Sequence, residues 1–173
     1  MEDRVLVAYA TKHGHTAEIA ERIGQVLKQA GLQTDVLPVD KVKDIKQYKA
    51  VIAGSSIYIA MWRKEFLRFL AAHEKILISM PLWIFSSGPI GEGNPVELSQ
   101  GWRFPEVQRP LIDAVKPRDI TVFQGAIDPN KMGILEKWVL KRVQAPTGDF
   151  RDWDLITKWT EEIISVLKPN SPV

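Results

Sequence analysis

Short apolar runs alternate along the chain with segments in which apolar residues recur every three or four positions. The runs have the length of buried strands and predict strands at residues 5–10, 34–37, 50–54, 82–85 and 120–125. The helical periodicity predicts helices at residues 16–30, 63–73 and 152–167. Alternating strands and helices are typical of a parallel sheet with helices on both faces, so the pattern predicts an α/β fold in three layers.

Two intervals exceed what a minimal five-strand unit needs. Residues 88–117 are rich in glycine and proline and are predicted to form a long ordered loop or lid with at most a short helix. Residues 126–150 carry an additional helical segment. We therefore expect one domain over residues 1–173 with insertions near 88–117 and 126–150. Both insertions begin at the carboxyl end of a predicted strand, which is where open α/β sheets bind ligands.

Composition excludes several classes of protein. The 173 residues are enough for one domain with a substantial core, and 45% of them are hydrophobic. The 23 basic and 21 acidic residues leave a formal charge of +2, which does not indicate nucleic-acid binding. Because cysteine is absent, disulfides, thiolate catalysis and cysteine-ligated metals are excluded, and redox chemistry would need a cofactor.

Residues 1–4 lead directly into the first predicted strand, without the apolar segment of a signal peptide. No apolar stretch approaches the ~20 residues that span a bilayer. We expect a cytoplasmic protein.

A polar loop joins the first predicted strand to the first predicted helix and has the pattern T-x-x-G-x-T. It comprises Thr11, Lys12, His13, Gly14, His15 and Thr16. Two hydroxyls and the N–H groups of a helix N-terminus can converge there on one anion. The loop lacks the glycines of a dinucleotide fingerprint and the G-K-[ST] of a Walker loop, so it fits a single terminal phosphate.

Two alternatives remain open for this loop. Thr16 could simply cap the helix. His13 and His15 could suggest a metal pair, but no third ligand has suitable spacing, so we expect no metal site.

Two further loops follow the third and fourth predicted strands and would meet the first at one edge of the sheet. One comprises Ser55, Ser56, Ile57 and Tyr58, and the other Ser86, Ser87, Gly88, Pro89, Ile90 and Gly91. With these loops in place, the chain resembles the flavodoxin-fold proteins over essentially its whole length. The resemblance implies a five-stranded parallel sheet of order 2-1-3-4-5 and an FMN cofactor. Residues 11–16 would then hold the FMN phosphate, residues 55–58 and 86–91 would line the isoalloxazine, and Tyr58 or Trp62 would stack on it unless these aromatics belong to the core.

Within that fold, the chain is most similar to the bacterial menaquinone-dependent protoporphyrinogen dehydrogenases. The similarity lies in Gly54–Tyr58, in Gly125-Ala126 and in Gly148-Asp149 followed by Trp153, whereas residues 86–91 and the stretch after them differ. It implies an FMN-dependent oxidoreductase that passes electrons from an organic substrate such as a porphyrinogen to a quinone. The alternative is a non-catalytic electron carrier between protein partners, but such carriers are usually strongly acidic. The catalytic residues stay unknown: Asp128 is the nearest predicted carboxylate, although it could only initiate a turn.

Residues 131–143 predict a helix with an apolar side and a basic side. Ile134, Leu135, Trp138, Val139 and Val143 face one way, and Lys137, Lys141 and Arg142 mostly face the other. This pattern is typical of a helix that lies on a membrane surface, and it predicts a peripheral contact with the inner face of the membrane. The alternative is that the apolar side packs on the core of the domain.

Overall fold

A parallel sheet forms the centre of the molecule in the computed structural model, which describes residues 4–169. Its parallel strands are β1 (Arg4–Ala10), β2 (Gln33–Pro38), β3 (Ala50–Tyr58), β5 (Leu82–Ser87) and β6 (Asp119–Phe123), in the order β2-β1-β3-β5-β6. This is the predicted 2-1-3-4-5 order. A short strand, β4 (Met61–Trp62), folds back antiparallel onto the end of β3.

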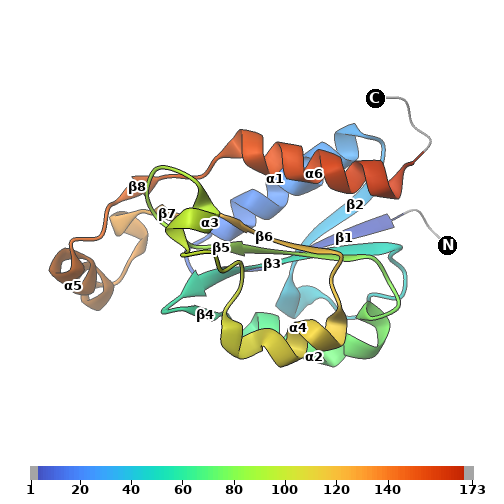
Figure 1. The fold of residues 1–173 in the computed structure, drawn as a ribbon, viewed down its shortest axis with the longest axis horizontal. Coiled ribbons are helices and arrows are strands. Elements are labelled where there is room, and N and C mark those ends of the chain that lie inside the picture. Colours follow the sequence, from blue (N-terminus) through green and yellow to red (C-terminus); the bar gives the residue numbers. More distant parts are fainter. Residues whose placement is uncertain (1–3, 170–173) are drawn as a thin grey trace.

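Helices cover both faces of the sheet, as Figure 1 shows. Helices α1 (His15–Gln29) and α6 (Trp153–Leu167) lie on one face, and α2 (Lys64–Leu77) and α4 (Arg109–Val115) lie on the other. Successive residues of a strand therefore enter different cores: Val5 and Val7 pack toward α1 and α6, while Leu6 and Ala8 pack toward α2. A strand buried on both faces reads as a continuous apolar run, which explains the run in β1.

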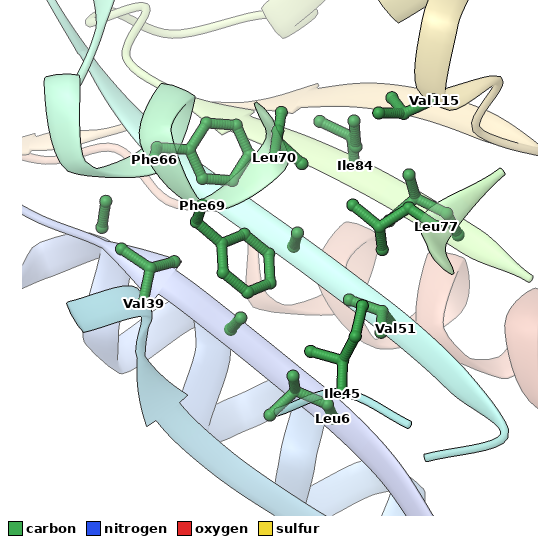
Figure 2. Close-up of a cluster of buried hydrophobic side chains, with 14 of the residues drawn as sticks. Leu6, Val39, Ile45, Val51, Phe66, Phe69, Leu70, Leu77, Ile84 and Val115 are labelled. Atoms are coloured by element: carbon green, nitrogen blue, oxygen red, sulfur yellow. The ribbon is translucent and has the colours of Figure 1, made fainter. Parts of the chain in front are cut away.

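The core between the sheet and α2 is drawn in Figure 2. Phe66, Phe69 and Leu70 reach from α2 toward the sheet, where they meet residues such as Leu6 and Ile84. These side chains are almost fully buried, so this packing fixes the position of α2 on the sheet.

Several predicted boundaries were wrong: β3 continues to Tyr58 rather than ending at residue 54, and the helix predicted at residues 131–143 begins at Ile134. Helix α2 continues to Leu77, beyond the predicted end at residue 73, and β6 ends at Phe123 rather than at residue 125. The interval 88–117 was predicted to hold at most a short helix, whereas it contains two, α3 (Pro95–Leu98) and α4, with the 3₁₀ turn η2 (Glu106–Gln108) between them. Ile112 and Val115 of α4 are buried in the core beside α2, so the last part of this interval is the crossover helix that leads to β6.

The insertion at residues 126–150 stands beyond the end of the sheet (Figure 1). Strands β7 (Ala126–Ile127) and β8 (Gly148–Asp149) pair antiparallel, and the Phe150 N–H donates to the Gly125 carbonyl at 3.2 Å. Between them lie the 3₁₀ turn η3 (Pro129–Lys131) and helix α5 (Ile134–Val143). A further 3₁₀ turn, η1 (Val39–Lys41), follows β2.

The apolar side of α5 does not pack on the core. Ile134 is 90% exposed, Trp138 is 57% exposed and Val143 is 64% exposed. The alternative in which this side joins the domain core is therefore wrong. Within residues 4–169, no helix has the length and apolar character needed to cross a membrane.

Candidate functional site

A cavity of 180 Å³ lies where the predicted loops meet, at the carboxyl ends of β1, β3, β5 and β6. Its lining includes most of the predicted site residues, namely Thr11, Lys12, His13, His15, Thr16, Ser56, Ile57, Tyr58, Ser87, Gly88 and Ile90. Gly125 and five residues of the insertion complete the wall, namely Ala126, Ile127, Asp128, Met132 and Leu140. The three predicted segments thus converge, although residues 55–58 belong to β3 and residues 86–87 to β5 rather than to loops, and the insertion closes one side.

The loop between β1 and α1 is shaped by a local hydrogen bond and one glycine. The Gly14 N–H donates to Thr11 Oγ1 at 3.0 Å, and Gly14 has a left-handed φ of 92° as the N-cap of α1. Gly14 itself does not line the cavity. No side chain caps α1, and Thr16 lies inside the helix, so Thr16 is not a capping residue. The positive end of α1 is therefore available to an anion.

Several buried polar atoms in the cavity wall have no hydrogen-bond partner. They are Nδ1 and Nε2 of His15, Nε2 of His13 and Oγ of Ser56. Burial, followed by the positive charges of Lys131 and Arg151, lowers the pKa of His15. Leaving buried polar groups unpaired is unfavourable, and such groups in a native structure indicate a ligand, ion or water that completes them.

A charged cluster fastens α5 to the loop between β1 and α1. Glu136 Oε1 accepts hydrogen bonds from Lys12 Nζ and from the Tyr58 hydroxyl, the latter at 3.3 Å, and it lies 3.4 Å from His13 Nε2. Lys12 Nζ also lies 3.4 Å from the centre of the Tyr58 ring. The hydrogen bond from Lys12, with a second from the Gly133 N–H, lowers the pKa of Glu136 to about 2. Glu136 is therefore ionised at neutral pH and holds α5 beside the cavity.

Sequence analysis did not identify Glu136 as a site residue. One signal was present: Glu136 is the only acidic residue among residues 131–143, which include four basic residues. An isolated acid in a basic segment indicates a specific cationic partner, but the sequence does not reveal that the partner is Lys12, 124 positions away.

Two predicted serines serve the fold instead of lining the cavity. Ser55 Oγ donates to the Ser56 carbonyl at 2.9 Å and accepts from the Arg63 N–H at 3.1 Å. Ser86 Oγ accepts from Trp62 Nε1 at 3.0 Å and donates to the Arg103 carbonyl at 2.7 Å. Both hydroxyls thus form their hydrogen bonds with other groups of the protein rather than with a ligand in the cavity.

Trp62 is also a structural residue. Its side chain is 3% exposed and packs edge-on against Phe66, with ring centres 5.0 Å apart. The prediction that Trp62 could stack on a ligand was wrong, because its ring belongs to the core. Tyr58 lines the cavity and remains the candidate aromatic.

In the loop after β5, some of the predicted site residues line the cavity and others do not. Gly88 and Ile90 line the cavity, whereas Pro89 and Gly91 do not. A Cβ on Gly88 would lie 2.9 Å from Ile57 Cβ, so glycine here allows two walls of the site to meet. The Pro89 carbonyl accepts from the Gly125 N–H at 2.9 Å, and the Gly91 carbonyl accepts from Gln124 Nε2 at 3.0 Å.

Asp128 lies at the cavity and also begins the turn expected from the sequence. It lines the cavity, and its Oδ1 accepts from the Asn130 N–H at 2.9 Å to begin η3. Across residues 4–169, no cluster of histidine and carboxylate side chains is arranged to hold a metal ion.

Comparison with known proteins agrees with this architecture. The sequence profile of the flavodoxin domain family matches residues 6–154. Protoporphyrinogen IX dehydrogenase [quinone] of Escherichia coli (strain K12) is 23% identical, over 92% of this chain and 94% of that protein. A flavodoxin from the domain Archaea superposes with a TM-score of 0.60 at 14% identity, covering 95% of this chain and 99% of that one. Rubredoxin oxygen:oxidoreductase of Desulfovibrio gigas gives a TM-score of 0.62 at 11% identity, covering 96% of this chain and 36% of that one. The profile match and the shared fold agree: this chain belongs to the flavodoxin domain family.

Proposed function

We propose that this protein binds FMN in the cavity and uses it as a redox cofactor. The observation that carries the proposal is the convergence of an uncapped helix N-terminus with the unpartnered atoms of His15 and Ser56. Thr11, His15 and Thr16 would hold the phosphate, because hydroxyls, a ring N–H and the helix end all favour an anion.

The remaining wall fits the isoalloxazine. Ile57, Gly88 and Ile90 provide apolar surface and close backbone, and Tyr58 provides an aromatic face. The cavity is smaller than the roughly 300–1,000 Å³ of pockets that bury a drug-sized ligand, so part of the cofactor would extend toward the surface beside Tyr58. Bound FMN supplies transfer of one electron or of a hydride.

Reconstitution with FMN tests cofactor binding. The purified full-length protein should be yellow, or become so with FMN, and should bind FMN more tightly than riboflavin, which lacks the phosphate. A protein that stays colourless and takes up no FMN refutes the proposal.

We further propose an FMN-dependent oxidoreductase that takes two electrons from an organic substrate and reduces a quinone to the quinol with two electrons and two protons. The support is the similarity to the E. coli dehydrogenase and the apolar wall that the insertion adds to the cavity. Ile127, Met132 and Leu140 would exclude water from the reacting edge of the cofactor. Asp128 is the cavity-lining carboxylate that would accept or donate a proton.

The assay is anaerobic incubation of the FMN-loaded protein with protoporphyrinogen and a quinone, followed by porphyrin fluorescence. Fluorescence that rises no faster than without the protein removes the porphyrinogen as substrate and leaves FMN binding intact.

The alternative function is that of a one-electron carrier. It is supported by the archaeal flavodoxin, because the superposition covers nearly the whole of both chains. It predicts a protein inert to quinones that accepts single electrons from a flavin reductase.

We also propose that the protein works in the cytoplasm and contacts the membrane surface through residues 131–143. The support is the exposed apolar side of α5, together with the basic residues Lys137, Lys141 and Arg142 on the same short helix. A quinone dissolved in lipid would then be within reach of the site.

A further inference from the structure

The turn between β3 and β4 has a backbone conformation that suits its residues poorly. Tyr58 pairs with Met61, so Ile59 and Ala60 form a two-residue hairpin loop. Both have positive φ, 50° and 56°. This combination is typical of type I′ turns, which favour Asn-Gly, whereas a β-branched residue in the left-handed region is strained.

The same isoleucine is unfavourable for a second reason. Its side chain is 81% exposed, and the neighbouring Met61 is also exposed. The fold therefore gains little packing from Ile59 while it carries both backbone strain and exposed apolar surface. Strained residues of this kind concentrate where a protein meets a ligand or partner.

The turn lies at the same end of the molecule as α5 (Figure 1). Tyr58, the residue before the turn, lines the cavity and contacts Glu136 of α5 through its hydroxyl. The turn and α5 therefore flank the mouth of one cavity. Helix α5 also exposes the apolar side chains of Leu135 and Trp138.

The basic residues of α5 indicate what kind of partner binds this apolar surface. Lys137, Lys141 and Arg142 are exposed on α5, and the Arg142 guanidinium lies 5.4 Å from the centre of the Trp138 ring. Glu136 is paired with Lys12, so it does not offset these charges at the surface. A second copy of the chain would bring the same positive charges into contact, whereas an anionic lipid surface complements both the basic and the apolar residues.

We propose that the turn at Ile59 and Ala60 is a second membrane anchor, so that turn and α5 together place the cavity mouth against an anionic bilayer. The inference rests on the proposed membrane contact of α5 and adds its orientation. A lipophilic electron acceptor then passes from the lipid to the cavity without crossing bulk water.

Two substitutions in the turn separate strain from membrane contact. Ile59→Asn relieves the strain and removes the apolar side chain, so it should raise Tm by a few degrees while weakening binding to phosphatidylglycerol-containing vesicles about tenfold. Ala60→Gly is the matched control, because it should raise Tm similarly and leave vesicle binding within about twofold of the wild type. Thermal unfolding of the full-length protein measures Tm, and co-sedimentation with these vesicles measures binding.

The outcomes distinguish the turn from α5. If Trp138→Ala weakens vesicle binding and Ile59→Asn does not, the turn is not an anchor and the α5 contact stands. If the wild type binds no vesicles, both fail, although FMN binding is unaffected. If Ile59→Asn instead dissociates a dimer seen in vesicle-free solution, the surface contacts a second copy and the membrane assignment is overturned.

Discussion

Ser86 and Ser56 lie on adjacent strands and should respond in opposite ways to removal of the hydroxyl. Ser86 is fully buried and bridges Trp62 Nε1 and the Arg103 carbonyl, whereas Ser56 Oγ faces the cavity without a partner. Ser86→Ala leaves the indole N–H of the buried Trp62 without an acceptor, at a cost of about 1–3 kcal/mol, and loses a second hydrogen bond worth about 1 kcal/mol. The Arg103 carbonyl belongs to an exposed residue and can bind water instead.

We therefore expect Ser86→Ala to lower the free energy of unfolding by about 2–3 kcal/mol. For a domain of 173 residues this corresponds to a fall in Tm of roughly 4–12 °C. Ser56→Ala removes an unsatisfied buried group, so the free energy of unfolding should stay within about 1 kcal/mol of the wild type or rise.

For FMN affinity we expect the opposite order, with the larger effect from Ser56→Ala. Ser56→Ala should weaken FMN binding about five- to tenfold, which is the loss of one hydrogen bond, and Ser86→Ala should leave it within about twofold. Urea unfolding of the ligand-free protein and fluorescence titration with FMN measure the two quantities separately. If Ser56→Ala destabilises the fold as much as Ser86→Ala and binds FMN normally, the division into structural and ligand-facing serines is refuted.

Three further predictions concern other parts of the fold and site. Gly54→Ala would place a Cβ 2.1 Å from the buried Phe85 ring and should destabilise the protein by about 1–3 kcal/mol in urea unfolding; an unchanged midpoint contradicts the packing described for β3. Because Lys12 depresses the pKa of Glu136 to about 2, below its ordinary value near 4.5, the stabilisation from this pair is present above about pH 4.5 and is lost as pH falls toward 2; Glu136→Gln should flatten that part of the stability profile, and identical profiles would count against the pair. A bound phosphate should draw a proton onto His15, whose pKa is lowered in the free protein, so FMN affinity should rise from pH 7.5 to about 6 in the wild type relative to His15→Gln; parallel pH profiles for FMN titrations of the two proteins would exclude His15 as a phosphate contact.

The sequence predicted the sheet well because both faces of its strands are buried. The run at Val5–Ala8 is fully buried and has the length and β-branched residues of a strand under helices on two sides, and β3 and β5 are similar. Helix α4 was missed because its seven residues include Pro110 and follow a glycine- and proline-rich stretch, so local signals favoured a loop. Its helicity depends on burial of Ile112 and Val115 against α2, which only the tertiary structure provides.

The site was predicted in its location more accurately than in its contacts. The spacing of strands and loops was enough to bring Thr11, Ser56 and Gly88 to one cavity, because parallel strands end at a common edge. It could not distinguish Ser55 and Ser86 from Ser56, since all three are serines at strand ends and their partners lie on other segments. Trp62 was misjudged for the same reason: whether an aromatic side chain enters the core depends on a backbone reversal at β4 that the sequence pattern does not indicate.

The pairing of β7 with β8 brings the two ends of the insertion together as neighbours. The residues between β7 and β8, including α5, therefore form an inserted segment that leaves and rejoins the domain at the same place, beside the end of the sheet. Its length can change during evolution or design without moving a strand of the central sheet, since no part of that sheet lies within it. The paired ends of the insertion are therefore a natural crossover point for exchanging this segment between members of the family.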